Sequence, residues 1–115
     1  MPGINVLVPV SDVAKACAFY ADLIGLARGD ASEEFATLRA NDANVWIHRD
    51  LDAVVLRGVE LWIGVDDVDE VHGRLVAAGV DDLRPPNDVA QWRLRVASAP
   101  DPDGRRVYIC APLTG

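Results

Sequence analysis

The sequence is poor in several features that would place it in a special class of protein. It contains two cysteines, Cys17 and Cys110, which are too few for a disulfide framework and belong to no closely spaced Cys or His pair of the kind that structural zinc sites use. It also lacks an uncharged apolar run of roughly 18 residues, which a membrane-spanning helix needs, and a basic-then-apolar leader. We therefore expect a soluble cytoplasmic protein whose two cysteines are small buried hydrophobic residues.

Basic residues are scarce as well. Eleven Lys and Arg stand against 18 Asp and Glu, which leaves a net charge of −7. Such a charge repels a phosphate backbone and an anionic membrane surface, so neither nucleic acid nor a membrane is expected as a partner. The 115 residues are half hydrophobic, enough to bury the core of one ordinary domain.

One pattern occurs twice along the chain. NVLVPVSDV at residues 5–13 alternates apolar and other residues and then meets a polar pair, and ELWIGVDDV at residues 60–68 repeats this 55 positions later. A helical pattern follows each copy, with apolar residues three and four apart. Gly25 and Gly79 end these two patterns. The repeat indicates a supersecondary unit that is used twice.

Strand-like segments follow each predicted helix. Turn residues separate them, with Asn41-Asp42 in the first half and the stretch 100–104 in the second. The predicted strands are FATLRA (35–40), NVWIHR (44–49), WRLRVAS (92–98) and RRVYIC (105–110), with weaker ones near 26–31 and 80–85. Each half therefore reads as βαβββ. We expect a single domain over 1–115, with module one at about 1–50, a linker at about 51–58 and module two at about 59–115.

Strand alternation separates an aliphatic face from a polar and aromatic one. If the helices cover the aliphatic face, the opposite face has a composition typical of a ligand pocket. The candidate ligand-binding residues on it are Asn5, Leu7, Trp46, His48, Glu60, Trp62, Arg106 and Tyr108. Trp92 is a further candidate, although the register of its strand is ambiguous and could place the indole under a helix.

Three segments resemble the vicinal oxygen chelate superfamily, which includes glyoxalases, bleomycin-resistance proteins and extradiol dioxygenases. They are SDVAKACAFYADLIGL (11–26), ELWIGVDDVDEVHGRLVAAGV (60–80) and DPDGRRVYI (101–109). The resemblance, which is to a bleomycin-resistance-like member, implies an α+β fold of two pseudo-symmetric βαβββ modules. It also implies that these form a half-open mixed β-barrel with a concave ligand cleft, in a homodimer.

The metal enzymes of that superfamily take ligands from equivalent positions of the two modules. Mapped onto this chain, those positions hold Asn5, Glu60 and Tyr108, and only Glu60 is a family-type ligand. An amide and a phenol make a far weaker site for a divalent ion than imidazole and carboxylate. His48, on the same predicted face, could in principle replace a missing ligand. We expect neither a metal nor another cofactor.

These observations favour a metal-independent protein that binds a small molecule, such as a cationic or aromatic antibiotic that it sequesters. In this hypothesis Trp46 and Trp62 offer flat apolar surface and cation–π attraction, and Glu60 pairs with a cationic group. Glu60 could instead be a solvated acid at the rim. The alternative function is a lyase, isomerase or dioxygenase of the same superfamily that uses a divalent metal, or Glu60 or His48 as a base.

Overall fold

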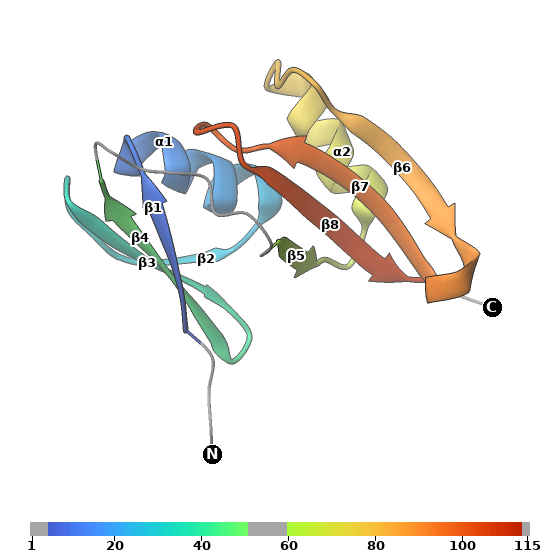
Figure 1. The fold of residues 1–115 in the computed structure, drawn as a ribbon, viewed down its shortest axis with the longest axis horizontal. Coiled ribbons are helices and arrows are strands. Elements are labelled where there is room, and N and C mark those ends of the chain that lie inside the picture. Colours follow the sequence, from blue (N-terminus) through green and yellow to red (C-terminus); the bar gives the residue numbers. More distant parts are fainter. Residues whose placement is uncertain (1–4, 51–59, 114–115) are drawn as a thin grey trace. The chain divides into compact units, whose positions relative to one another are not determined.

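The chain folds into two compact units, Met1–Val55 and Leu56–Gly115, each of which carries one βαβββ module (Figure 1). The computed structural model describes residues 5–50 and 60–113, so the predicted linker at about 51–58 lies outside the described residues. Within these ranges, no helix combines the length and the apolar character that crossing a membrane requires. The α+β class and the paired βαβββ modules are as predicted.

The first unit is a four-stranded sheet with one helical segment. Its strands stand in the order β1-β4-β3-β2, with β1 parallel to β4 and the other neighbours antiparallel. The elements are β1 (Asn5–Val10), α1 (Val13–Cys17), the π-helical segment η1 (Ala18–Ile24), β2 (Ala27–Ala31), β3 (Phe35–Ala40) and β4 (Ala43–Arg49). The turn at Asn41-Asp42 joins β3 to β4, as predicted.

The helix of the first unit begins and ends where its sequence indicates. The carboxylate of Asp12 accepts a hydrogen bond from the backbone N–H of Lys15 at 3.0 Å, which satisfies a donor that the first turn leaves free. Gly25 adopts a left-handed φ of 111° and ends the segment. The helix packs on β3 and β4 and buries the predicted aliphatic face, which includes Val8 and Ile47.

The second unit repeats this plan. Its strand order is β5-β8-β7-β6, with β5 parallel to β8. The elements are β5 (Leu61–Gly64), α2 (Val68–Ala77), β6 (Arg84–Val89), the 3-10 segment η2 (Ala90–Trp92), β7 (Leu94–Pro100) and β8 (Arg106–Pro112). Asp67 caps α2 through the N–H of Glu70 at 3.1 Å. The helix packs on β6, β7 and β8. Leu75 of the helix and Val107 and Ile109 of β8 are fully buried, so the predicted face is again the covered one.

Two predicted strands of the second unit are displaced along the chain. The strand expected near 80–85 is β6 at Arg84–Val89, with both prolines inside it. Proline is tolerated there because β6 is an edge strand whose register shifts between Arg84 and Asn87. The strand expected at 92–98 begins at Leu94, because the chain makes a 3-10 turn through Trp92 and Arg93 takes a left-handed φ of 54°.

The turn between β7 and β8 is held by a buried ion pair. The side chain of Asp101 is fully buried, and its Oδ2 lies 2.7 Å from Nη1 of Arg105, whose side chain is 12% exposed. Oδ1 accepts backbone N–H groups of Asp103 and Arg105 at 3.0 and 2.9 Å. Asp101 therefore organises the turn as well as neutralising Arg105.

Removal of this carboxylate should destabilise the protein strongly. Asp101→Ala removes the buried carboxylate that pairs with the Arg105 guanidinium and accepts two backbone N–H groups of the turn, so we expect the free energy of unfolding to fall by about 3 kcal/mol. Glu70→Ala is the matched control, because Glu70 pairs with Arg74 in an exposed i,i+4 salt bridge. This substitution should lower the free energy of unfolding by at most about 0.5 kcal/mol. Urea denaturation followed by circular dichroism measures both, and equal losses would contradict the assignment.

Candidate functional site

Three aromatic side chains of the second unit form a continuous surface, which we call the aromatic surface: Trp62, Trp92 and Tyr108. Trp62 and Tyr108 are register partners on β5 and β8, and their rings stack with centroids 4.4 Å apart and an interplanar angle of 8°. Trp92 meets Trp62 edge to face at 6.0 Å and 80°. The sequence left the register of Trp92 ambiguous. In the structure Trp92 packs against Trp62 and does not lie under the helix.

The aromatic surface is open to solvent. Trp92 is 55% exposed and Trp62 is 39% exposed, whereas the residues of the same strands that face α2, such as Val107 and Ile109, are fully buried. Aromatic side chains bury large areas when they serve as core, so rings that are ordered against each other yet exposed offer that area to a ligand.

Glu60 lies beside these rings, immediately before β5. Its Oε1 accepts a hydrogen bond from Nε1 of Trp62 at 3.3 Å, which fixes the carboxylate at the edge of the indole. Among the described residues, no Arg, Lys or His forms a salt bridge with Glu60. The site therefore combines stacked aromatic area with a carboxylate whose charge no described cation neutralises.

Arg106 has the predicted strand position, but its guanidinium is engaged elsewhere. Its Nη2 lies 2.6 Å from Oδ2 of Asp82, and its Nη1 donates to the Asp82 carbonyl at 2.8 Å and to the Ser98 hydroxyl at 3.3 Å. These contacts tie β8 to the loop after α2. A ligand that used Arg106 would have to compete with them, and its role in binding stays a prediction.

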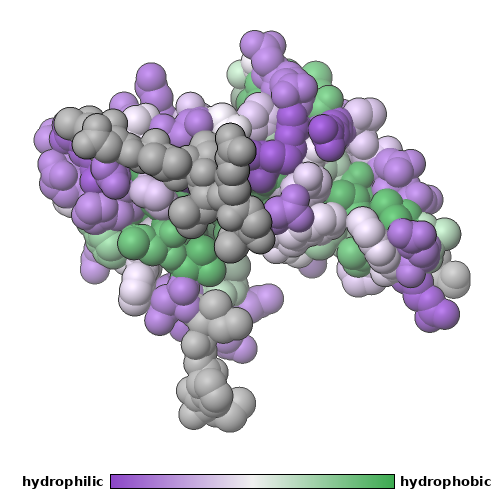
Figure 2. Space-filling view, viewed as in Figure 1, coloured by the Kyte–Doolittle hydropathy of each residue, from purple (hydrophilic) through white to green (hydrophobic). Residues whose placement is uncertain are grey.

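The remaining candidates lie on the first unit, on the face of the sheet that α1 does not cover. Leu7, which is 53% exposed, is the register partner of Trp46, and Phe35 is the partner of His48. Figure 2 shows hydrophobic residues at the surface over β1, β3 and β4. Phe35 is absent from the predicted set, although the two-residue turn at Asn41-Asp42 already fixes the pairing of Phe35 with His48.

The three superfamily ligand positions do not fit a divalent metal. Asn5 is on the first unit, where its Oδ1 accepts a hydrogen bond from Nδ2 of Asn44 at 3.0 Å. Glu60 and Tyr108 are on the second unit, and each contacts Trp62. An amide, a carboxylate and a phenol are a poor donor set for such an ion. Within residues 5–50 and 60–113, no three His, Cys, Asp or Glu side chains gather as potential ligands.

Family comparison agrees with this architecture of paired βαβββ modules. The model of the glyoxalase-like domain matches residues 5–110. The chain therefore belongs to the glyoxalase-like domain family, and the predicted resemblance to the vicinal oxygen chelate superfamily is confirmed. No curated protein sequence matches the chain.

Solved structures share the fold over nearly the whole chain. The antibiotic-binding protein TnmS3 from Streptomyces sp. CB03234 has a TM-score of 0.77 and 25% identity, over 97% of this chain and 96% of that one. A bleomycin resistance determinant encoded on transposon Tn5 has a TM-score of 0.74 and 17% identity, over 97% of this chain and 98% of that one. A virulence protein from Salmonella typhimurium has a TM-score of 0.72 and 15% identity, over 98% of both chains.

Cys110 lies on the same side of β8 as Tyr108 and is only partly buried, whereas the sequence predicted a buried cysteine. Partial burial raises the pKa of its thiol above the ordinary value, because desolvation disfavours the thiolate. The thiol is therefore neutral near pH 7, where a nucleophilic role would require the thiolate.

The pH dependence of alkylation by iodoacetamide measures the pKa of the Cys110 thiol. We expect the rate at Cys110, followed by peptide mass spectrometry, to reach half its maximum at a higher pH than the rate for free cysteine, because burial raises the pKa of the thiol. Free cysteine in the same buffer is the control. A half-maximal rate near neutral pH would contradict the raised pKa and indicate a reactive thiolate at Cys110.

Proposed function

We propose that this chain binds a small cationic compound with a planar aromatic part, without a metal, on the aromatic surface and beside Glu60. The observation that carries the proposal is the exposed Trp62, stacked on Tyr108 and hydrogen-bonded at its edge to a carboxylate that no described cation neutralises. Binding of this kind needs a complementary surface and no reactive centre.

The aromatic rings supply most of the attraction in this proposal. A planar ligand that covers exposed indole area removes apolar surface from water. If the ligand carries a cation over a ring face, the attraction gains roughly 0.5–2 kcal/mol, depending on how far the pair is desolvated. Trp62 and Tyr108 hold each other in place, so ordering them on binding costs little entropy.

Charge selects among planar ligands. Glu60 places a carboxylate at the edge of the rings, and the net charge of −7 extends the negative field around the protein. Cationic compounds are attracted on approach and paired at the site, whereas anionic ones are repelled. Two proteins of the same fold, one described as antibiotic-binding and one as a bleomycin resistance determinant, support an antibiotic as the natural ligand.

A charge series on one ring system tests the proposal through tryptophan fluorescence. We expect naphthylmethylammonium to change the fluorescence saturably, naphthylmethanol to bind more weakly, and naphthoate to bind least. Trp62→Ala should abolish most of the response to the cation. Equal binding of all three compounds would remove the role of charge, and no response from any would contradict the aromatic surface as the site.

Glu60→Gln separates the charge from the shape of the site. The substitution keeps an acceptor for Trp62 Nε1 but removes the negative charge, so affinity for naphthylmethylammonium should fall roughly five- to tenfold while that for naphthylmethanol stays constant. Asp66→Asn is the matched control, because Asp66 is an exposed acid beyond the opposite end of β5 and its loss should leave both affinities unchanged. A uniform loss for both ligands would indicate a structural role.

We also propose that the protein is a homodimer, as the superfamily resemblance implies. The exposed Leu7 and Phe35 on the uncovered sheet face of the first unit support this, because association would remove their apolar area from water. Light scattering at micromolar concentration should give twice the chain mass of 12.4 kDa. A mass of one chain at every concentration would refute the dimer.

A further inference from the structure

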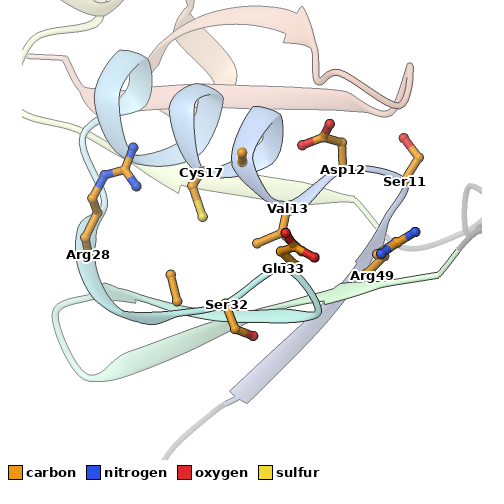
Figure 3. A pocket seen from close by; sticks show the side chains of 10 residues that line it. Ser11, Asp12, Val13, Cys17, Arg28, Ser32, Glu33 and Arg49 are labelled. Atoms are coloured by element: carbon orange, nitrogen blue, oxygen red, sulfur yellow. The ribbon is translucent and has the colours of Figure 1, made fainter.

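The first unit contains a hollow on the helix side of its sheet, away from the face that carries Trp46 and His48. Its volume is about 670 Å³, within the range of small-molecule sites. Figure 3 shows it between α1, the turn that joins β2 to β3, and the end of β4. Its lining includes Asp12, Val13, Cys17, Arg28, Glu33 and Arg49.

The hollow exists because the helix covers only part of the sheet. Helix α1 packs on β3 and β4, whereas all five residues of β2 are exposed. Small side chains, Ala14 on the helix and Ala31 at the end of β2, line the space that remains. An uncovered strand beside small residues therefore leaves room for a ligand.

The floor of the hollow is apolar. Val13 and Cys17 are 4% and 2% exposed, and Figure 3 shows both side chains directed from α1 toward β2 and the β2–β3 turn. Burial also raises the pKa of the Cys17 thiol, so the sulfur remains neutral at pH 7 and acts as apolar surface.

The charged walls of the hollow are net negative once their ion pairs are counted. Arg28 makes two hydrogen bonds to Asp22, at 3.2 and 2.8 Å, and Arg49 lies 3.1 Å from Oε1 of Glu34. Both arginines are thus neutralised by acids outside the lining.

The two acids of the lining remain. Asp12 accepts the N–H of Lys15, and within the described part of the chain no hydrogen bond or salt bridge engages the carboxylate of Glu33. Glu33 and Val13 both line the hollow, and Figure 3 shows Glu33 extending into it from the turn between β2 and β3. Asp12 caps the N-terminus of α1, whose partial positive charge offsets that carboxylate. Glu33 is therefore the acid of the lining that favours a positively charged group beside the apolar floor.

We propose that this hollow is a second ligand site, which takes a small organic ammonium compound whose apolar body lies on Val13 and Cys17 and whose cation pairs with Glu33. The site is separate from the aromatic surface and does not depend on it. It recognises aliphatic bodies as well as aromatic ones, because its floor contains no ring.

Amide chemical shifts of the full chain test the site with a matched series of cyclohexylammonium, cyclohexanol and cyclohexanecarboxylate. We expect the ammonium compound to shift the amides of Val13, Cys17, Ala31 and Glu33 saturably, and the alcohol and the carboxylate to shift them far less. Glu33→Gln should weaken ammonium binding roughly five- to tenfold. Asp30→Asn, an exposed acid on β2 outside the lining, should leave it unchanged.

Three results would overturn the proposal: equal shifts from all three compounds, no saturable shift in the hollow, or an unchanged affinity in Glu33→Gln. Shifts confined to Trp62, Trp92 and Tyr108 would also overturn it, while leaving the aromatic surface intact. Conversely, failure of the naphthyl series at Trp62 would leave the hollow unaffected, so the two sites succeed or fail independently.

Discussion

The two-residue period of the β-strand is the constraint on which the rest of this structure depends. Among the described residues, one α-helix packs on the sheet of each unit, α1 in the first and α2 in the second, and one helix can shield only one face of a four-stranded sheet. Val8 and Ile47 in the first unit, and Val107 and Ile109 in the second, lie under their helices. Their neighbours along each strand must then point the other way, so Trp46, Trp62 and Tyr108 reach the second face because of the same alternation that builds the core.

That division explains how much of the molecule could be predicted from its sequence. Asp12, Gly25, Asp67 and Gly79 fix the helix ends through local chemistry, and the Asn41-Asp42 turn fixes the register of β3 and β4. Local sequence patterns do not show how the tertiary structure accommodates residues that are unfavourable in a strand. Pro85 and Pro86 are tolerated in β6 because it is an edge strand with a register shift. Trp92 meets Trp62 from a 3-10 turn that ends at Arg93 in a left-handed conformation.

The candidate site shows the same limit. Strand parity predicts that Trp62 and Tyr108 share a face, and their stacking follows from the parallel register of β5 and β8. Parity cannot tell that Arg106 is held by Asp82, because that acid lies in a loop 24 residues away along the chain. The hollow beside Cys17 is equally hidden from sequence, since it arises from the part of the sheet that α1 leaves uncovered.

The prolines of β6 have a further consequence for the behaviour of the protein in concentrated solution. β6 is one of the two edge strands of its sheet, and an edge strand normally presents a row of unpaired amide donors to which the strand of another chain can bind. Pro85 and Pro86 have no N–H to offer, and the register irregularity beside them interrupts the row. Pro85 and Pro86 therefore disfavour the addition of further strands at this edge, and with it the growth of fibres.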